Sequence, residues 1–80
     1  MSAMVQAIIL EVLRTWPTAG TAPVVLNEAT IAAHAGSLLE NDVHATLELL
    51  KIRGFVDDCY RRTPSGDFEL LGWMLTPAGK

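Results

Sequence analysis

Hydrophobic residues recur every three or four positions over the first part of the chain, a spacing typical of one face of an α-helix. They occupy about half of a helical wheel: Met4, Val5, Ile8, Ile9, Val12, Leu13 and Trp16. Leu10 falls on the opposite side, among polar residues, so we expect it to be exposed. Because Pro17 disfavours helical backbone at the residue before it, we expect the first helix to span Ser2–Thr15.

The middle of the chain combines a short apolar run with the signals of a second helix. Thr18–Pro23 is rich in Thr, Ala, Gly and Pro and is expected to form a loop. Val24–Leu26 can form a short strand. Asn27 is a favourable N-cap residue, which predicts a helix through Ala35 that ends at Gly36.

A third helix is predicted next. Ser37 and Glu40 have the spacing of a capping box, and we expect the helix they open to continue to about Arg53 and to end at Gly54. Its core side is defined by Leu39, Val43, Leu47 and Leu50. A second apolar line follows the same helix: Leu38, Ala45, Leu49 and Ile52. Burying both lines requires packing on two sides, so we expect the later strands to cover the second line, with a partner protein as the alternative.

The hydrophobic period changes after this helix. Phe55–Arg62 is a predicted strand, and Phe68–Thr76, rich in large apolar side chains, is the returning strand. Between them, Thr63–Asp67 contains a Pro-Ser-Gly core that suits a tight turn. The complete order of helix, short strand, two helices and hairpin predicts an α+β fold.

This order resembles a winged helix-turn-helix domain, and the local sequence resembles the DNA-binding core of MarR-like transcriptional regulators. The residues that carry the resemblance are the helix and glycine turn Thr30–Gly36, the recognition-helix positions Val43, Leu47, Leu50 and Gly54, the wing start Phe55–Val56 and the closing segment Leu75–Gly79. Together they extend over nearly the whole chain.

The resemblance implies a small winged helix-turn-helix over residues 1–80, as a single domain of three helices, a β-hairpin wing and a possible short first strand. In this family the third helix enters the major groove of duplex DNA and the wing contacts its backbone or minor groove. A DNA-binding transcription regulator is therefore expected. The lone Cys59, which excludes an internal disulfide framework, favours a cytoplasmic setting. The turn from Gly36 to Val43 is longer than the family's usual turn. In MarR-like proteins Leu75–Gly79 leads into a dimerisation helix, whereas this sequence ends at Lys80, so that mode of dimerisation is not carried over.

Candidate DNA contacts lie on the polar flank of the third helix. Asn41 can pair with adenine, His44 can donate to a base or a phosphate, and Lys51 can neutralise a phosphate. Glu48 can accept from cytosine, although it repels phosphate, as does Glu40. The alternative is a solvated helix face on which Glu48 and Lys51 form an ordinary i, i+3 pair.

Two further candidates, Arg61 and Arg62, come directly before the expected turn of the wing. In an alternating strand they point to opposite faces, and either can reach a phosphate or a narrow minor groove. The alternative is that they offset Asp57, Asp58 and Asp67 in surface ion pairs.

The net charge of −3 changes this picture, because it opposes the general attraction to phosphate on which DNA affinity depends. It favours an alternative function, an acidic winged-helix adaptor that binds a protein partner through Leu10 and the second apolar line. A DNA-binding protein with so few cations would also bind DNA more tightly as a homodimer, or when attached to another part of a larger protein.

Other kinds of site lack their usual signatures. Cys59 and the two histidines do not have the spacing of zinc ligands, and Cys59 is expected to be a small, part-buried strand residue. The sequence contains no phosphate-binding glycine loop and no nucleophile elbow, so no catalysis, metal or cofactor is expected. No apolar run reaches the ~18 residues of a membrane span, so no membrane association is expected.

Overall fold

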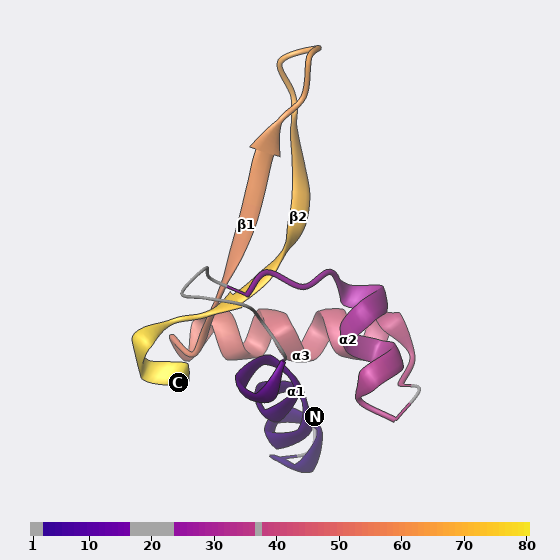
Figure 1. Ribbon diagram of the computed structural model, residues 1–80, viewed down its shortest axis with the longest axis vertical. Coiled ribbons are helices and arrows are strands. Elements are labelled where there is room, and N and C mark those ends of the chain that lie inside the picture. The colour runs from indigo at the N-terminus through magenta and orange to yellow at the C-terminus, as the bar shows by residue number, and fades with distance from the viewer. Residues whose placement is uncertain (1–2, 17–23, 37) are drawn as a thin grey trace.

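The computed structural model describes residues 3–16, 24–36 and 38–80 (Figure 1). Three helices precede a two-stranded antiparallel hairpin and a short 3-10 helix: α1 (Ala3–Thr15), α2 (Glu28–His34), α3 (Glu40–Ile52), β1 (Val56–Arg62), β2 (Phe68–Leu75) and η1 (Pro77–Gly79). This order confirms the expected α+β fold with a small winged-helix topology. Ser2, the expected loop Thr18–Pro23 and Ser37 lie outside the described residues.

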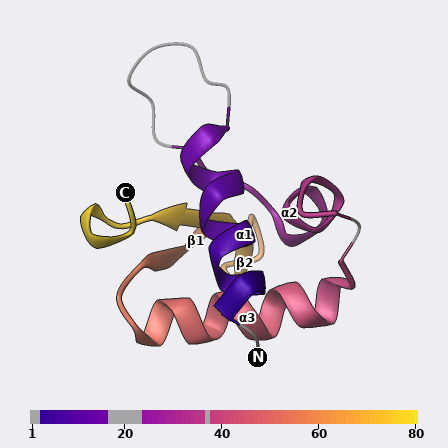
Figure 2. The same cartoon turned by 90° about the horizontal axis from the view of Figure 1, so that it is seen from below.

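The helices pack around one cluster of buried apolar side chains. α1 lies across α3, and α2 packs beside both (Figure 2). The largest fully buried apolar residues come from all parts of the fold: Ile9, Ile31, Val43, Leu47, Leu50, Val56 and Trp73. Leu10 belongs to the same cluster at 9% exposure, so its expected exposure is wrong. The reason is that α1 contacts α2, α3 and β2, and therefore buries more of its circumference than a single face.

The starts of α2 and α3 differ in how closely they follow the sequence signals. Asn27 accepts a hydrogen bond from the Thr30 N–H at 2.8 Å, which confirms the expected N-cap, and Gly36 follows α2 with a φ of 87°. α3 instead begins at Glu40, and the N-cap position is held by Leu39 without a side-chain hydrogen bond. The expected capping box is therefore wrong, since Glu40 is the first helical residue. Leu39 has extended backbone and is 70% exposed, so it also does not lie on the expected core side of α3.

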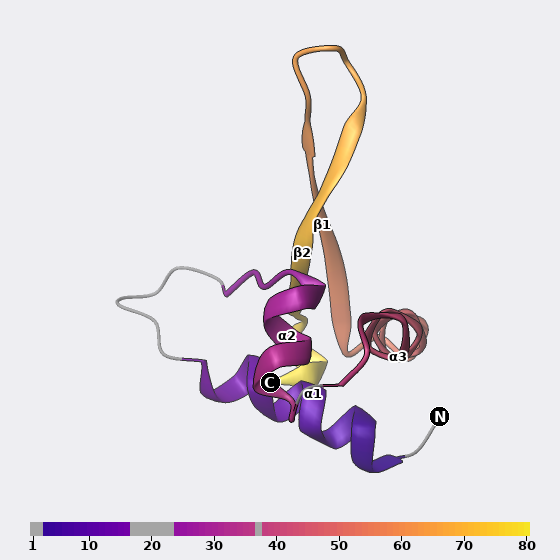
Figure 3. The ribbon, with the colours of Figure 1, turned by 90° about the vertical axis from the view of Figure 1, so that its right-hand side faces the viewer.

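β1 and β2 form an antiparallel ladder that projects away from the helices and twists along its length (Figure 3). The register shifts between Cys59, which is opposite Gly72, and Tyr60, which is opposite Leu70. Leu71 is consequently an extra residue in β2, and an insertion of this kind increases the local twist.

Backbone contacts fix the tip and the base of the hairpin. At the tip, the Gly66 N–H donates to the Thr63 carbonyl at 2.9 Å, and the φ of 92° at Gly66 confirms the expected tight turn. At the base, Leu26 and Trp73 form a bridge through two backbone hydrogen bonds of 3.0 and 2.8 Å. The expected short strand Val24–Leu26 is therefore present, within the described residues, only as this single bridge at Leu26.

The segment after β2 folds back against α1 and the end of α3. Thr76 donates its hydroxyl hydrogen to the Gly54 carbonyl at 2.5 Å and its backbone N–H to the Phe55 carbonyl at 3.1 Å. The guanidinium of Arg14 on α1 donates to the Gly79 carbonyl at 2.8 Å. Gly54 has a φ of 83°, as expected for a glycine that ends a helix. These contacts hold the base of the wing in a fixed place beside α3.

Candidate nucleic-acid interface

One line of side chains on α3 faces solvent, opposite the buried side of this helix. Val43, Leu47 and Leu50 have no exposed surface and hold α3 against the core. Helical geometry places another line on the far side: Asn41, Ala45, Glu48 and Ile52. Glu48 is partly buried and the other members of this outward line are exposed. A molecule that approaches this side of α3 therefore contacts the outward line first.

The structure separates the predicted contacts into three groups. They are Asn41 and Glu48 on the outward line, His44 and Lys51 on the side of α3 that faces α2 and the base of the wing, and Arg61 and Arg62 near the wing tip. The wing arginines stand away from α3, because the hairpin projects from the helices instead of lying along them (Figure 1). The predicted residues thus form two separate regions, one on α3 and one on the wing.

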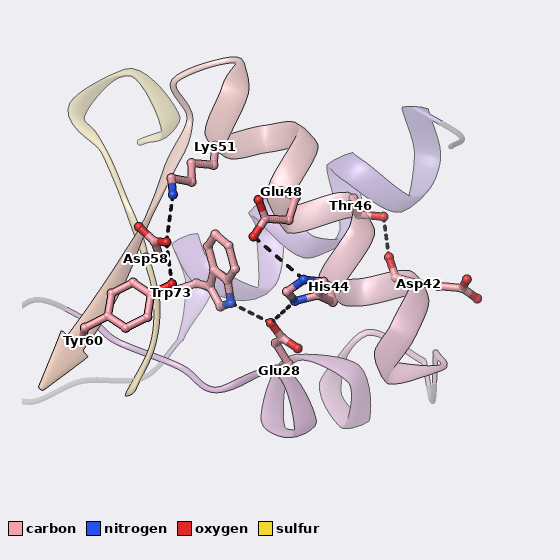
Figure 4. Close-up of polar contacts among 9 residues, drawn as sticks. All are labelled: Glu28, Asp42, His44, Thr46, Glu48, Lys51, Asp58, Tyr60 and Trp73. Atoms are coloured by element: carbon pink, nitrogen blue, oxygen red, sulfur yellow. Dashed lines mark hydrogen bonds and ion pairs between the residues drawn. The ribbon is translucent and has the colours of Figure 1, made fainter. Parts of the chain in front are cut away.

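His44 is bound to a carboxylate that the sequence did not single out (Figure 4). Its Nδ1 lies 2.6 Å from Oε2 of Glu28, at the start of α2, and its Nε2 lies 3.8 Å from Oε1 of Glu48. The indole N–H of Trp73 donates to the same Glu28 oxygen at 3.0 Å. The hydrogen bond to Glu28 is the main reason that the pKa of His44 is raised. The sequence signal for Glu28 was only its place directly after the N-cap Asn27.

Lys51 is held by the wing instead of pairing with Glu48. Its Nζ donates to Oδ2 of Asp58 at 2.8 Å, and the Tyr60 hydroxyl donates to the same oxygen at 3.0 Å. The bond to Lys51 is the main reason that the pKa of Asp58 is lowered, and it raises the pKa of Lys51 in return. Lys51 and Asp58 therefore join α3 to β1, and phosphate would have to compete with Asp58 for this cation.

The two wing arginines have different surroundings. Arg61 forms an ion pair with Glu69, its opposite residue on β2, and not with any of the three aspartates considered from the sequence. Arg62 is opposite Phe68 and has no hydrogen-bond or ion-pair partner among the described residues. Arg62 is the one predicted cation whose charge is not already engaged within the described part of the chain.

The second apolar line of α3 is not covered by the strands. Ile52 is 82% exposed and Ala45 is also exposed, whereas Leu38 and Leu49 are partly buried. The expectation that the strands cover this line is wrong, because the hairpin leaves α3 at a steep angle (Figure 1).

Exposed apolar side chains gather instead on the wing, where the sequence predicted only the cationic contacts Arg61 and Arg62. They are Tyr60, Phe68, Leu70 and Leu71. A large apolar patch on a small protein commonly marks an interaction surface.

Other chemistry is limited in the described part of the chain. Cys59 is partly buried, as expected, and burial is the main reason that the pKa of its thiol is raised, so the reactive thiolate is disfavoured. Within residues 3–16, 24–36 and 38–80, no three side chains of His, Cys, Asp or Glu gather as metal ligands. None of the helices described is both long and apolar enough to cross a bilayer.

Comparison of the chain with protein-family models, with curated proteins and with solved structures finds no match. The fold and the geometry above are therefore the basis for any functional conclusion.

Proposed function

We propose that this chain is a small winged-helix DNA-binding protein, and that it regulates transcription as the MarR-like proteins it resembles do. The observation that carries the proposal is the outward line of α3, most of which is exposed. The wing projects beside this helix (Figure 1). An α-helix fits the major groove of B-form DNA, and a wing of this kind reaches the adjoining backbone or minor groove.

The outward line has the chemistry for reading base edges. Asn41 can form paired hydrogen bonds with adenine, Ala45 can contact the methyl group of thymine, and Glu48 can accept from the amino group of cytosine. None of these contacts depends on a positive charge. They supply discrimination between sequences, whereas phosphate contacts supply most of the affinity.

The cations available for phosphate limit that affinity. If Arg62 alone binds phosphate, the slope of log K against log salt is about −1, and it reaches about −3 if Lys51 and Arg61 leave their carboxylates. His44 adds to this attraction only when it is protonated. The proposed protein therefore binds random duplex weakly and with a shallow salt dependence.

Fluorescence anisotropy with labelled random-sequence duplex, titrated at several salt concentrations, tests this proposal. We expect weak binding with a slope in the range given above. Asn41→Ala should reduce discrimination between selected and random sites without changing the slope, whereas Arg62→Ala should flatten the slope by about one. A chain that binds no duplex even at low salt, where screening is weakest, would sink the proposal.

A second candidate function is that of a protein-binding adaptor, and one observation favours it. The wing carries exposed apolar side chains, with Phe68 at 72% and Tyr60 at 54% exposure. Buried Leu10 no longer supports this function. Absence of duplex binding together with association through the wing would favour the adaptor.

A further inference from the structure

One face of the hairpin carries a continuous strip of exposed side chains, Tyr60, Arg62, Phe68 and Leu70, here called the wing strip. Tyr60 is opposite Leu70 and Arg62 is opposite Phe68. Opposite residues share a face, as do residues two apart on one strand. Asp58 shares this face, since the Tyr60 hydroxyl bonds to it, and Asp58 also binds α3. The base of this face, at Asp58, is therefore turned toward α3, and the wing strip continues from it toward the wing tip.

The wing strip has the properties of a protein-docking surface. At their exposed fractions of 72% and 54%, Phe68 and Tyr60 leave on the order of 250 Å² of aromatic side chain in water. Around it, two arginines balance Asp67 and Glu69, so residues 60–71 have no net charge although the whole chain has −3. Two copies of this acidic chain can therefore approach each other through the wing with little electrostatic repulsion.

We propose that the wing strip docks against the wing strip of a second copy of this chain, in a two-fold symmetric dimer. If the two strips lie antiparallel with Tyr60 near the symmetry axis, position 62 of one copy faces position 58 of the other, since both are two residues from the centre. Arg62, which has no ionic partner among the described residues, then lies beside Asp58, whose Oδ2 already accepts from Lys51 and Tyr60. The symmetry makes this charge contact and the aromatic contact occur twice.

The size of the strip sets the strength of this dimer. The aromatic side chains of two copies contribute about 500 Å² together, and the leucines beside them add to this. Interfaces below about 1,200 Å² belong to the weak and transient class. The dimer is accordingly expected to form reversibly as the protein concentration rises.

Self-association of this kind competes with DNA binding. In the proposed dimer, Arg62 of the second copy lies beside Asp58, which binds Lys51 on α3, so the second copy occupies the space beside Lys51. It also engages Arg62, the cation that is free to bind phosphate. The dimer is a form that duplex must displace, and its formation does not depend on whether the chain binds DNA.

Sedimentation equilibrium of the full chain over a concentration series tests the dimer, with Phe68→Ser as the main variant. Met4→Ser is a matched control, since Met4 is also 72% exposed but belongs to α1, a helix on the side of the molecule away from the wing tip (Figure 1). We expect Phe68→Ser to raise the dimer dissociation constant by about tenfold or more, because an aromatic contact is lost on both copies. Met4→Ser should leave it unchanged. Far-UV circular dichroism verifies that both variants are folded.

A charge reversal provides a second test that does not touch the apolar side chains. Arg62→Glu brings carboxylates together across the proposed interface, so it should also raise the dissociation constant by about tenfold. Lys80→Glu makes the same change in net charge at the end of the chain and should have no effect. The comparison of Arg62→Glu with Lys80→Glu still tests the dimer if Phe68→Ser fails to fold.

The outcomes separate this inference from the proposed function. A chain that stays monomeric at every concentration overturns the dimer, as does an equal effect of Phe68→Ser and Met4→Ser. A chain that dimerises but binds no duplex overturns the DNA-binding function and supports the dimer. A dimer that dissociates as duplex is added supports both. A monomeric chain whose duplex binding weakens in Phe68→Ser assigns the strip to DNA and overturns the dimer.

Discussion

Removal of the Glu28 carboxylate tests whether this side chain joins α2, α3 and the wing. Its Oε2 accepts from the indole N–H of Trp73 at 3.0 Å and lies 2.6 Å from Nδ1 of His44. Trp73 is only 1% exposed, so water cannot readily replace the lost acceptor. We expect Glu28→Ala to lower the free energy of unfolding by about 1–3 kcal/mol, the cost of leaving a buried donor without a partner.

Glu28→Gln is the matched variant that separates the hydrogen bond from the charge. Its side-chain carbonyl can still accept from Trp73, so the main loss is the carboxylate in the first turn of a helix, about 0.3–1 kcal/mol. Glu48→Gln removes a second carboxylate near His44 without affecting Trp73, and it should leave stability nearly unchanged. The expected order of stability is wild type and Glu48→Gln, then Glu28→Gln, then Glu28→Ala.

The same variants carry a pH dependence through His44. The hydrogen bond to Glu28 is the first cause of the raised pKa of His44 in the folded state, so the folded chain favours the imidazolium. The stability gained in this way is fully present below the ordinary pKa of about 6.5 and is lost as the pH rises through the raised folded value. Glu28→Gln should therefore flatten the change in stability between mildly acidic and mildly alkaline pH. The effect is small, because His44 is half exposed.

Thermal unfolding followed by circular dichroism, repeated across this pH range, measures both effects. For a chain of this size, 1 kcal/mol corresponds to about 4–8 °C in melting temperature. An NMR titration of the His44 ring would show the raised pKa directly in the wild type. The reasoning is refuted if Glu28→Ala and Glu28→Gln melt at the same temperature, since the Trp73 hydrogen bond would then contribute nothing.

Three other substitutions test the wing and its attachment. Gly54→Val should lower the free energy of unfolding by about 1–2 kcal/mol, because the φ of 83° at this glycine is unfavourable for a residue with a Cβ; an unchanged urea midpoint would contradict this. Gly72→Ala should cost about 1–3 kcal/mol, since its Cβ would lie 2.5 Å from the Leu26 carbonyl oxygen, and loss of hydrogen-exchange protection at Leu26 would locate the damage. Glu69→Gln should release Arg61 and steepen the salt slope of duplex binding by about one, and an unchanged slope would show that Arg61 does not contact phosphate.

Local patterns were sufficient to predict the elements of the fold, and their limits appear where tertiary packing decides. The helical spacing of Val43, Leu47 and Leu50 identified the buried side of α3 correctly. The helical wheel gave the wrong exposure for Leu10, because it does not show how many elements pack around α1. It failed at Leu39 because one extended residue before the helix lies outside helical periodicity. The capping box failed for the same reason, since it depends on the exact start of α3.

The candidate site was less predictable, because its charged residues find partners that are distant in sequence. The pattern predicted the exposure of the chosen side chains except for partly buried Glu48. It could not predict that Glu28 reaches His44 from another helix. The partner of Arg61 depends on the register of the hairpin, which puts Glu69 directly opposite it. The sequence alone does not determine that register, because the register depends on the geometry of the turn and on the extra residue Leu71. The exposure of Phe68 was not predicted, because a hydrophobic strand residue is more often buried.

The placement of the cations bears on the proposed DNA-reading surface, because it limits how many positive charges this acidic chain could offer to phosphate. Arg14 and Arg53 serve the scaffold: the first holds the Gly79 carbonyl, and the second donates to Gln6 at 2.6 Å and stacks on Phe55 at 5.0 Å from its ring centroid. Using either for phosphate would loosen the base of the wing.

Lys51 and Arg61 differ from these scaffold cations, because they are held by exposed ion pairs, and pairs of that kind contribute little to stability. A phosphate can therefore recruit these two cations without disturbing the fold, but each must first leave a carboxylate. Arg62 has no such competitor among the described residues, and it lies on the same face as Phe68. If both proposals hold, the wing tip is consequently the place where a duplex and a second copy of the chain compete most directly, and the ratio of their affinities there decides which state is populated.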